Sequence, residues 1–224
     1  MNKYCIVVAG GSGTRMKSAI PKQFLVLGNK PILLHTLDQF IKYDSSINII
    51  LVLPENEIAT WENIRKQYSF MHPLRVAFGG KTRHQSVANG LALVPNESIV
   101  AVHDAVRPLI SNDLLQRCFQ EAENNGSAIP VIPVNDSIRQ IVGEKSKQVN
   151  RNDFVIVQTP QCFNSSTLKK AFEQPEDPSF TDEASVLEQS GIPVHLIEGE
   201  KQNLKITNPE DLLIASAILS QDKD

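Results

Sequence analysis

Residues 4–16 read YCIVVAGGSGTRM, an apolar run that passes directly into a glycine-rich turn. A short, continuous apolar run bounded by glycines is typical of a buried strand in a parallel sheet. Glycines after such a strand let the backbone approach a ligand closely and present its N–H groups to phosphate oxygens. The stretch therefore predicts a buried strand at residues 4–9, followed by an anion-binding turn.

Downstream of this stretch, strands and helices alternate in the predicted pattern. Apolar runs predict further strands at residues 47–53, 74–78, 99–103 and 128–133. Apolar residues at helical spacing predict helices near residues 31–41, 58–68, 87–94 and 114–122. Such alternation implies an α/β fold, in which helices cover both faces of a mainly parallel sheet. Ligands of such sheets bind at the carboxyl ends of the strands.

The alternation stops near Val134. Residues 137–142 and 149–157, separated by a polar turn at 143–147, predict a β-hairpin. Helices are expected at 165–172 and 181–189, and short strands at 194–198 and 204–207. Asn208 and Pro209 predict the start of a last helix. We expect one domain over residues 1–224, with residues 134–157 forming an arm that projects from it.

Composition excludes several classes of function. The chain has 224 residues and a net charge of −3, which argues against a general nucleic-acid-binding surface. No apolar run approaches the ~20 residues needed to span a bilayer. The three cysteines are far apart in the sequence, which argues against a zinc site or a disulfide framework and favours buried thiols. We expect a cytoplasmic protein that does not bind membranes.

The glycine-rich turn fits neither of two common phosphate-binding motifs. The dinucleotide fingerprint GxGxxG and the P-loop GxxxxGK[ST] each require glycine where this chain has Met16. Two cations remain beside the turn, Arg15 and, seven residues later, Lys22. They suit a triphosphate, although a tight turn with solvated cations is the alternative.

Six motifs, in order, carry a specific resemblance. They are AGGSGTRM at 9–16 with PKQ at 21–23, GGKTRHQSV at 79–87, HDAVRP at 103–108, QTPQ at 158–161, TDEA at 181–184, and NLKIT at 203–207 with PED at 209–211. Together they resemble the 2-C-methyl-D-erythritol 4-phosphate cytidylyltransferase family of non-mevalonate isoprenoid synthesis. The resemblance implies a Rossmann-like fold of the nucleotide-diphospho-sugar transferase type.

The resemblance also implies the chemistry and its residues. The family joins CTP to a polyol phosphate and releases pyrophosphate, and the acceptor's own phosphate is the nucleophile. By resemblance, Arg15 and Lys22 are catalytic, and Mg²⁺ or another divalent cation binds Asp104. The implied CTP-binding residues are Ala9, Gly10, Gly11, Gly13, Thr14, Gly80, Lys81, Ser86, Asp104 and Ala105. The arm of one subunit would embrace a second subunit, and the implied acceptor-phosphate residues are Ser137, Arg151, Thr181 and Lys205.

Several of these residues also have simpler interpretations. Asp104 could instead cap a turn, Thr181 could be a helix N-cap, and Arg151 could be a solvated surface charge. We interpret His103 as a buried structural histidine and Arg107 as the partner of a nearby acid. Lys81 stands where some family members have an acidic residue.

Two rival functions follow from the same motifs. Ribitol 5-phosphate cytidylyltransferase performs the same chemistry on a similar acceptor, and residues 149–161 and 198–207 favour the methylerythritol enzymes. A non-catalytic nucleotide sensor is the second rival, and retention of both Arg15 and Lys22 argues against it.

Overall fold

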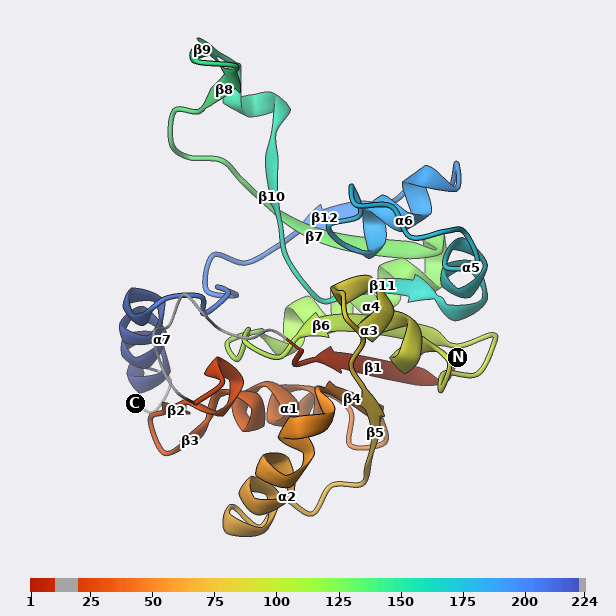
Figure 1. The fold of residues 1–224 in the computed structure, drawn as a ribbon, viewed down its shortest axis with the longest axis vertical. Coiled ribbons are helices and arrows are strands. Elements are labelled where there is room, and N and C mark those ends of the chain that lie inside the picture. The colour runs from red at the N-terminus through yellow and green to blue at the C-terminus, as the bar shows by residue number, and fades with distance from the viewer. Residues whose placement is uncertain (11–19, 222–224) are drawn as a thin grey trace.

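The computed structural model describes residues 1–10 and 20–221, and Figure 1 shows its central sheet with the arm projecting from one end. The sheet follows the order β10-β7-β11-β6-β1-β4-β5, with β12 also pairing with β7. Its strands are β1 (Lys3–Val8), β4 (Asn48–Leu53), β5 (Leu74–Phe78), β6 (Ile99–Asp104), β7 (Ser127–Pro133), β10 (Val155–Val157), β11 (Gln161–Asn164) and β12 (Leu196–Glu198). The small strands β2 (Val26–Leu27) and β3 (Lys30–Pro31) pair with each other.

The parallel part of the sheet reverses its order beside β1. The strands β4 and β5 follow one another on one side of β1, whereas β6 pairs with its other side. All three of these pairings are parallel, while β11 and β10 run antiparallel to their neighbours. In such sheets the ligand crevice lies at the carboxyl ends of the strands where the order reverses. A ligand-binding site is therefore expected at the ends of β1 and β6, where Val8 pairs with Asp104.

Helices cover both faces of the sheet, as the sequence predicts. Alternate residues of a strand point to opposite faces, so that Cys5 and Val7 join one apolar cluster while Tyr4 and Ile6 join another. The first cluster includes side chains of α1 (Ile32–Tyr43), α2 (Ile58–Gln67) and α4 (Asn112–Asn125). The second includes those of α3 (Arg83–Leu91), α5 (Ser165–Ala171) and α6 (Glu183–Gln189). The structure thus confirms the predicted fold class.

A glycine, three cysteines and a third apolar cluster complete the description of the core. Gly90 lets α3 lie against the sheet, because a Cβ there would come within 2.8 Å of Ile6 and 3.0 Å of Val52. All three cysteines are buried and reduced, as predicted, and belong to the first cluster. A third apolar cluster lies beneath α7 (Pro209–Gln221) and contains Ile206.

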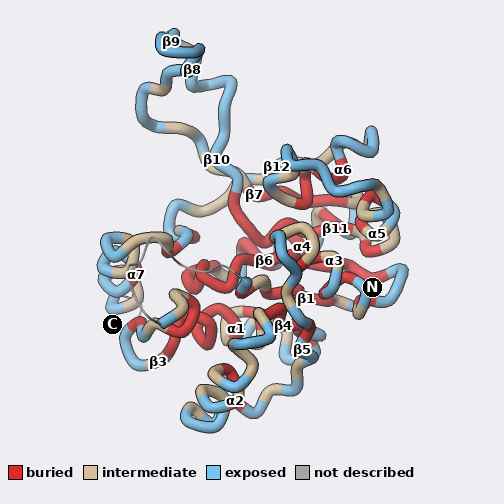
Figure 2. Tube along the Cα trace, in the orientation of Figure 1, coloured by how far each residue is buried: buried red, intermediate tan, exposed pale blue. Residues whose placement is uncertain are grey.

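The arm is present, but its strand pairing differs from the prediction. The hairpin consists of β8 (Arg139–Val142) and β9 (Lys145–Gln148), joined by a two-residue loop that begins with Gly143 at φ 59°. The predicted second strand, residues 149–157, is instead a short 3-10 helix at Arg151–Asp153 followed by β10, which pairs with β7 of the main sheet. Figure 2 shows most of the arm exposed, with a few residues of intermediate burial. Because both faces of the hairpin meet solvent, a polar sequence forms β9 where the pattern predicted only a turn.

The last part of the chain differs from the prediction in two places. The helix expected at 181–189 begins at Glu183, because the Asp182 side chain accepts from the Ser185 N–H and forms the N-cap. Residues 204–207 form no strand, since Ile206 donates its N–H to Val106 and packs beneath α7. The start of α7 agrees with the prediction, and Asn208 accepts from the Asp211 N–H. Among the described residues, 3-10 helices also form at Lys22–Phe24 and Glu55–Glu57.

Over residues 1–10 and 20–221, no helix combines the length and the apolar character needed to cross a membrane.

Candidate active site

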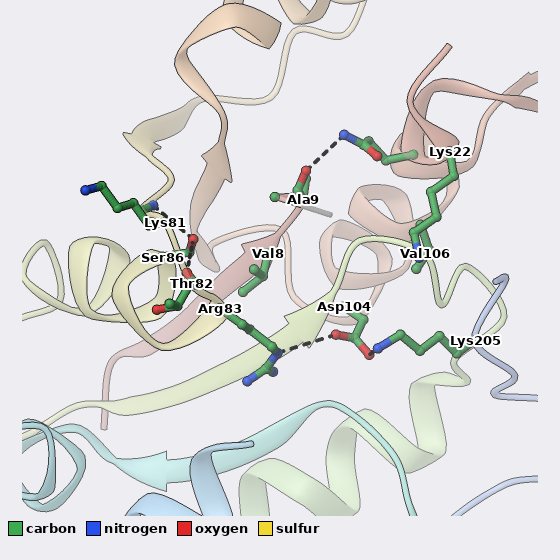
Figure 3. Close-up of a pocket in the computed structure, with 13 residues that line it drawn as sticks. Val8, Ala9, Lys22, Lys81, Thr82, Arg83, Ser86, Asp104, Val106 and Lys205 are labelled. Atoms are coloured by element: carbon green, nitrogen blue, oxygen red, sulfur yellow. Dashed lines mark hydrogen bonds and ion pairs between the residues drawn. The ribbon is translucent and has the colours of Figure 1, made fainter. Parts of the chain in front are cut away.

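A pocket lies at the carboxyl ends of β1 and β6, where the strand order reverses, and Figure 3 shows it in close-up. Backbone turns after β1 and β5 and the start of α3 form part of its wall. The described residues that line it are Val8, Ala9, Gly10, Lys22, Gln23, Gly80, Lys81, Thr82, Arg83, Ser86, Asp104, Val106 and Lys205. Residues predicted from four separate motifs therefore meet in one cavity.

The turn after β1 is held at its base by Gln23. The buried Gln23 amide donates to the Ala9 carbonyl over 2.9 Å, and the Ala9 N–H donates to Val52 of β4. Lys22, beside Gln23, lines the same pocket. The other predicted residues of this turn, namely Gly11, Gly13, Thr14 and Arg15, lie outside the residues that the structure describes.

The turn after β5 is fixed by the first residues of α3. The Gly80 N–H donates to Ser86 Oγ over 3.0 Å, and Ser86 Oγ donates its proton to the Thr82 carbonyl over 2.8 Å. Thr82 caps the helix by accepting from the Gln85 N–H. A Cβ at position 80 would come within 2.3 Å of the Gln85 Cβ. Glycine is therefore required at position 80 by close packing.

Asp104 is the acidic centre of the pocket and faces three cations. Its Oδ2 lies 3.0 Å from Lys205 Nζ and 3.2 Å from Arg107 Nε, and its Oδ1 lies 4.0 Å from Arg83 Nε. Figure 3 shows Arg83 and Lys205 reaching it from opposite sides. Burial alone would raise the pKa of Asp104, but Lys205, Arg83 and Arg107 hold that pKa well below its usual range. The carboxylate is therefore ionised at neutral pH.

His103 supports Asp104 from the protein interior. The Thr159 hydroxyl accepts from the Asp104 N–H over 3.0 Å and lies 3.2 Å from His103 Nδ1. His103 Nε2 lies 3.1 Å from the Arg107 carbonyl. Burial lowers the pKa of His103 to about 4, so that the ring is neutral and its two nitrogens serve as one donor and one acceptor. The structure confirms the interpretation of His103 as a buried structural residue.

Arg107 and Asn203 fasten the segment that carries Lys205. Arg107 donates to the Asn203 carbonyl over 2.8 Å while it pairs with Asp104, as the sequence predicts for its acid partner. The buried Asn203 amide donates to the Thr159 carbonyl, also over 2.8 Å. The Lys205 side chain remains 40% exposed and reaches the pocket.

The structure does not bring all of the predicted acceptor residues together. Ser137 and Arg151 line one hollow on the arm, where Arg151 donates to the Asn135 carbonyl. In Figure 1 this arm stands away from the ends of β1 and β6. Thr181 is exposed, and its alternative role as the N-cap of α6 is wrong because Asp182 holds that position. Within one chain, only Lys205 of the four lines the pocket.

The structure also identifies residues that sequence reasoning did not select. Glu183 pairs with Arg83, and Gln23 holds the first turn. Gln23 belongs to the motif PKQ and Glu183 to the motif TDEA, so their place in these motifs could have marked them as site residues. Their partners are distant in sequence, so the motif alone did not indicate what they contact.

The family model of 2-C-methyl-D-erythritol 4-phosphate cytidylyltransferase (IspD) matches residues 4–221. A protein of that name from Bacteroides fragilis is 47% identical over 219 residues, which cover 98% of this chain and 100% of the relative. Another from Bacillus licheniformis is 37% identical over 226 residues, covering 100% of this chain and 98% of the relative.

Solved structures agree with these relatives. The crystal structure of 4-diphosphocytidyl-2C-methyl-D-erythritol synthase from Anaerococcus prevotii superposes with a TM-score of 0.83 at 26% identity, covering 98% of each chain. The 2-C-methyl-D-erythritol 4-phosphate cytidylyltransferase from Francisella tularensis gives a TM-score of 0.81 at 30% identity, covering 97% of this chain and 99% of the other. This chain therefore belongs to the 2-C-methyl-D-erythritol 4-phosphate cytidylyltransferase family.

Proposed function

We propose that this enzyme transfers the cytidylyl group of CTP to 2-C-methyl-D-erythritol 4-phosphate, giving 4-diphosphocytidyl-2-C-methyl-D-erythritol and pyrophosphate. One observation carries the proposal: Lys22, Arg83 and Lys205 line the same cavity as the glycine turns. Cations and backbone N–H groups in one cavity suit a triphosphate beside a second phosphate. The full-length relatives of that name support this choice of acceptor.

The acceptor phosphate supplies the nucleophile, so the protein needs only to position and stabilise charge. One acceptor oxygen forms a bond to the α-phosphorus of CTP, and the bond from that phosphorus to the β-phosphate oxygen breaks. Pyrophosphate leaves with the electron pair of that bond. Lys22, together with Arg15, stabilises the charge that gathers on the α-phosphate and the leaving group.

Ser86 supports the selection of cytosine over uracil. Its only proton is committed to the Thr82 carbonyl, and one of its lone pairs accepts from Gly80. Ser86 Oγ can therefore only accept a hydrogen bond from a base. The amino group of cytosine can donate that bond, whereas the carbonyl of uracil cannot. Lys81, which stands where some family members have an acidic residue, is exposed and lines the same pocket, and its N–H donates to Gln85 Oε1 over 3.0 Å.

The residues present fit a Mg²⁺ ion that arrives with the triphosphate. Among the described residues, no three His, Cys, Asp or Glu side chains are grouped closely enough to hold an ion. Within the part of the chain that the structure describes, the ion pair of Asp104 Oδ1 with Arg83 Nε, at 4.0 Å, is longer than the two ion pairs of Oδ2, so Oδ1 is the oxygen that would bind. Mg²⁺ is commonly bound by one or two carboxylates plus substrate phosphates and water. When bound, the ion would neutralise part of the phosphate charge.

The arm completes the acceptor site from a second subunit in this proposal. Ser137 and Arg151 lie on the arm. They do not line the pocket of their own chain, which contains Lys205. The exposed apolar side chains of β10, which include Val155 and Ile156, support an interface at the base of the arm. We therefore expect a homodimer in which each arm, residues 134–157, reaches the partner's pocket.

A competition assay tests the choice of acceptor. The enzyme is given CTP with equal amounts of methylerythritol 4-phosphate and ribitol 5-phosphate, and both products are measured by mass spectrometry. We expect the methylerythritol product to predominate by about tenfold or more. Predominance of the ribitol product would contradict the proposed acceptor, and tight CTP binding without any pyrophosphate would favour a nucleotide sensor.

A further inference from the structure

Arg83 and Glu183 form a two-pronged ion pair between segments that lie 100 residues apart in the chain. The Arg83 Nη1 group donates to Glu183 Oε1, and Nη2 donates to Oε2 over 2.9 Å. Arg83 is the first residue of α3, and Glu183 is the first residue of α6. A bidentate pair fixes orientation as well as distance. It therefore sets the start of α6 relative to the start of α3.

The two partners differ in exposure. The Glu183 side chain is 1% exposed, whereas that of Arg83 is 31% exposed and lines the pocket. Arg83 also directs its Nε toward Asp104, at 4.0 Å. Without Glu183, Asp104 would be the nearest carboxylate remaining to Arg83. The pair thus links the acidic centre of the pocket with α6.

A second contact holds the same end of α6. The buried Gln161 amide, on β11, donates to Asp182 Oδ2 over 2.8 Å and accepts from the Ala184 N–H over 3.0 Å. Thr181 donates its N–H to Ser185 Oγ over 3.2 Å, so it is attached to the same capped turn. Arg83 and Gln161 therefore hold the segment that carries Thr181 from two sides.

We infer that Glu183 is a positioning residue for the acceptor: through Arg83 it holds Thr181 in register with the nucleotide pocket. This inference rests on the proposed function and on the family resemblance, which implies that Thr181 binds the acceptor phosphate. The Glu183 side chain is buried and does not line the pocket. Loss of the pair lets the start of α6 move, and the acceptor then binds in a less productive position.

Kinetics of the Glu183→Gln variant test this role, with Asp38→Asn as the matched control. Asp38 pairs with Lys30 outside the pocket, so the control also removes a carboxylate from an intrachain ion pair. In Glu183→Gln we expect the KM for methylerythritol 4-phosphate to rise about tenfold or more, with a much smaller change in the KM for CTP. The Arg83→Lys/Glu183→Gln double variant should show no further rise in acceptor KM over Arg83→Lys alone, because Arg83→Lys already breaks the contact that Glu183→Gln removes. Asp38→Asn should leave both constants unchanged.

Amide hydrogen exchange without substrates gives a readout that is independent of turnover. We expect residues 181–187 to lose protection in Glu183→Gln and to keep it in Asp38→Asn. If Glu183→Gln does not fold, Glu183→Asp keeps the charge but withdraws it by one methylene, and the same two changes are expected.

The results separate this inference from the proposed function. An unchanged acceptor KM, or equal rises for acceptor and CTP, would show that the pair only stabilises the fold. If the wild-type enzyme does not use methylerythritol phosphate but protection is lost in Glu183→Gln, the proposed function fails while the contact between α3 and α6 stands.

Discussion

Asp104 shows how the surroundings of one side chain decide its chemistry. Burial favours the protonated acid, yet the cations of Lys205, Arg83 and Arg107 lower its pKa far enough to keep it ionised. From the motif HDAVRP, Asp104 is predicted as a site residue and Arg107 as the partner of a nearby acid. The motif does not indicate Arg83 or Lys205 as further partners, because these residues come from distant segments that only the folded chain brings together.

Lys22 is expected to act on the reaction more than on nucleotide binding. We predict that Lys22→Ala lowers kcat by about two to three orders of magnitude, because it removes a cation from the place where charge develops. The KM for CTP should change much less. Lys22→Arg should also be impaired, since a planar guanidinium does not replace a compact ammonium.

Steady-state kinetics with CTP and methylerythritol 4-phosphate check this prediction, with Lys42→Ala as the control. Lys42 is an exposed lysine of α1 outside the pocket. A Lys22→Ala enzyme with the turnover rate of the wild type would remove Lys22 from the mechanism.

The arm shows what an element-level pattern can and cannot predict. The change from alternating helices and strands to two strands joined by a polar turn predicted a projecting hairpin, and β8 and β9 form one, although β9 lies within the predicted turn and its last residue follows it. The pattern did not predict that β10 returns to pair with β7. Side-chain alternation reports which face of a strand is buried, but it says nothing about which strand lies beside it. By contrast, the buried strands β1, β4 and β5 were predicted to within about a residue at each end, because each is a continuous apolar run.

A mixed dimer tests whether the arm acts on the partner subunit. Lys22→Ala and Arg151→Ala should each be nearly inactive alone. When the two are co-expressed, half of the dimers are mixed, and each mixed dimer contains one site with both an intact pocket and an intact arm. We therefore expect recovery of about a quarter of wild-type activity.

The control places both changes in one chain. Wild-type protein co-expressed with the Lys22→Ala/Arg151→Ala double variant forms mixed dimers with no complete site, so only the wild-type homodimers contribute activity. Activity from these mixed dimers, or no recovery in the first experiment, would show that the arm serves its own chain.

At the scale of the whole molecule, topology explains why distant motifs meet. The order of strands reverses beside β1, and the turns after β1, β5 and β6 therefore open on one cavity. The sequence predicts a mainly parallel sheet with its ligands at the carboxyl ends of the strands, because alternating strands and helices have few possible topologies. It does not predict side-chain contacts between distant segments, such as the pair of Arg83 with Glu183.

The most direct test of the whole account is product formation by the purified enzyme. CTP, methylerythritol 4-phosphate and Mg²⁺ are supplied, pyrophosphate is measured continuously, and the cytidylyl product is identified by mass spectrometry, with UTP in a parallel reaction. The account predicts equal amounts of pyrophosphate and 4-diphosphocytidyl-2-C-methyl-D-erythritol from CTP, and a rate lower by about tenfold or more with UTP. No product from CTP, or equal rates with the two nucleotides, would contradict it.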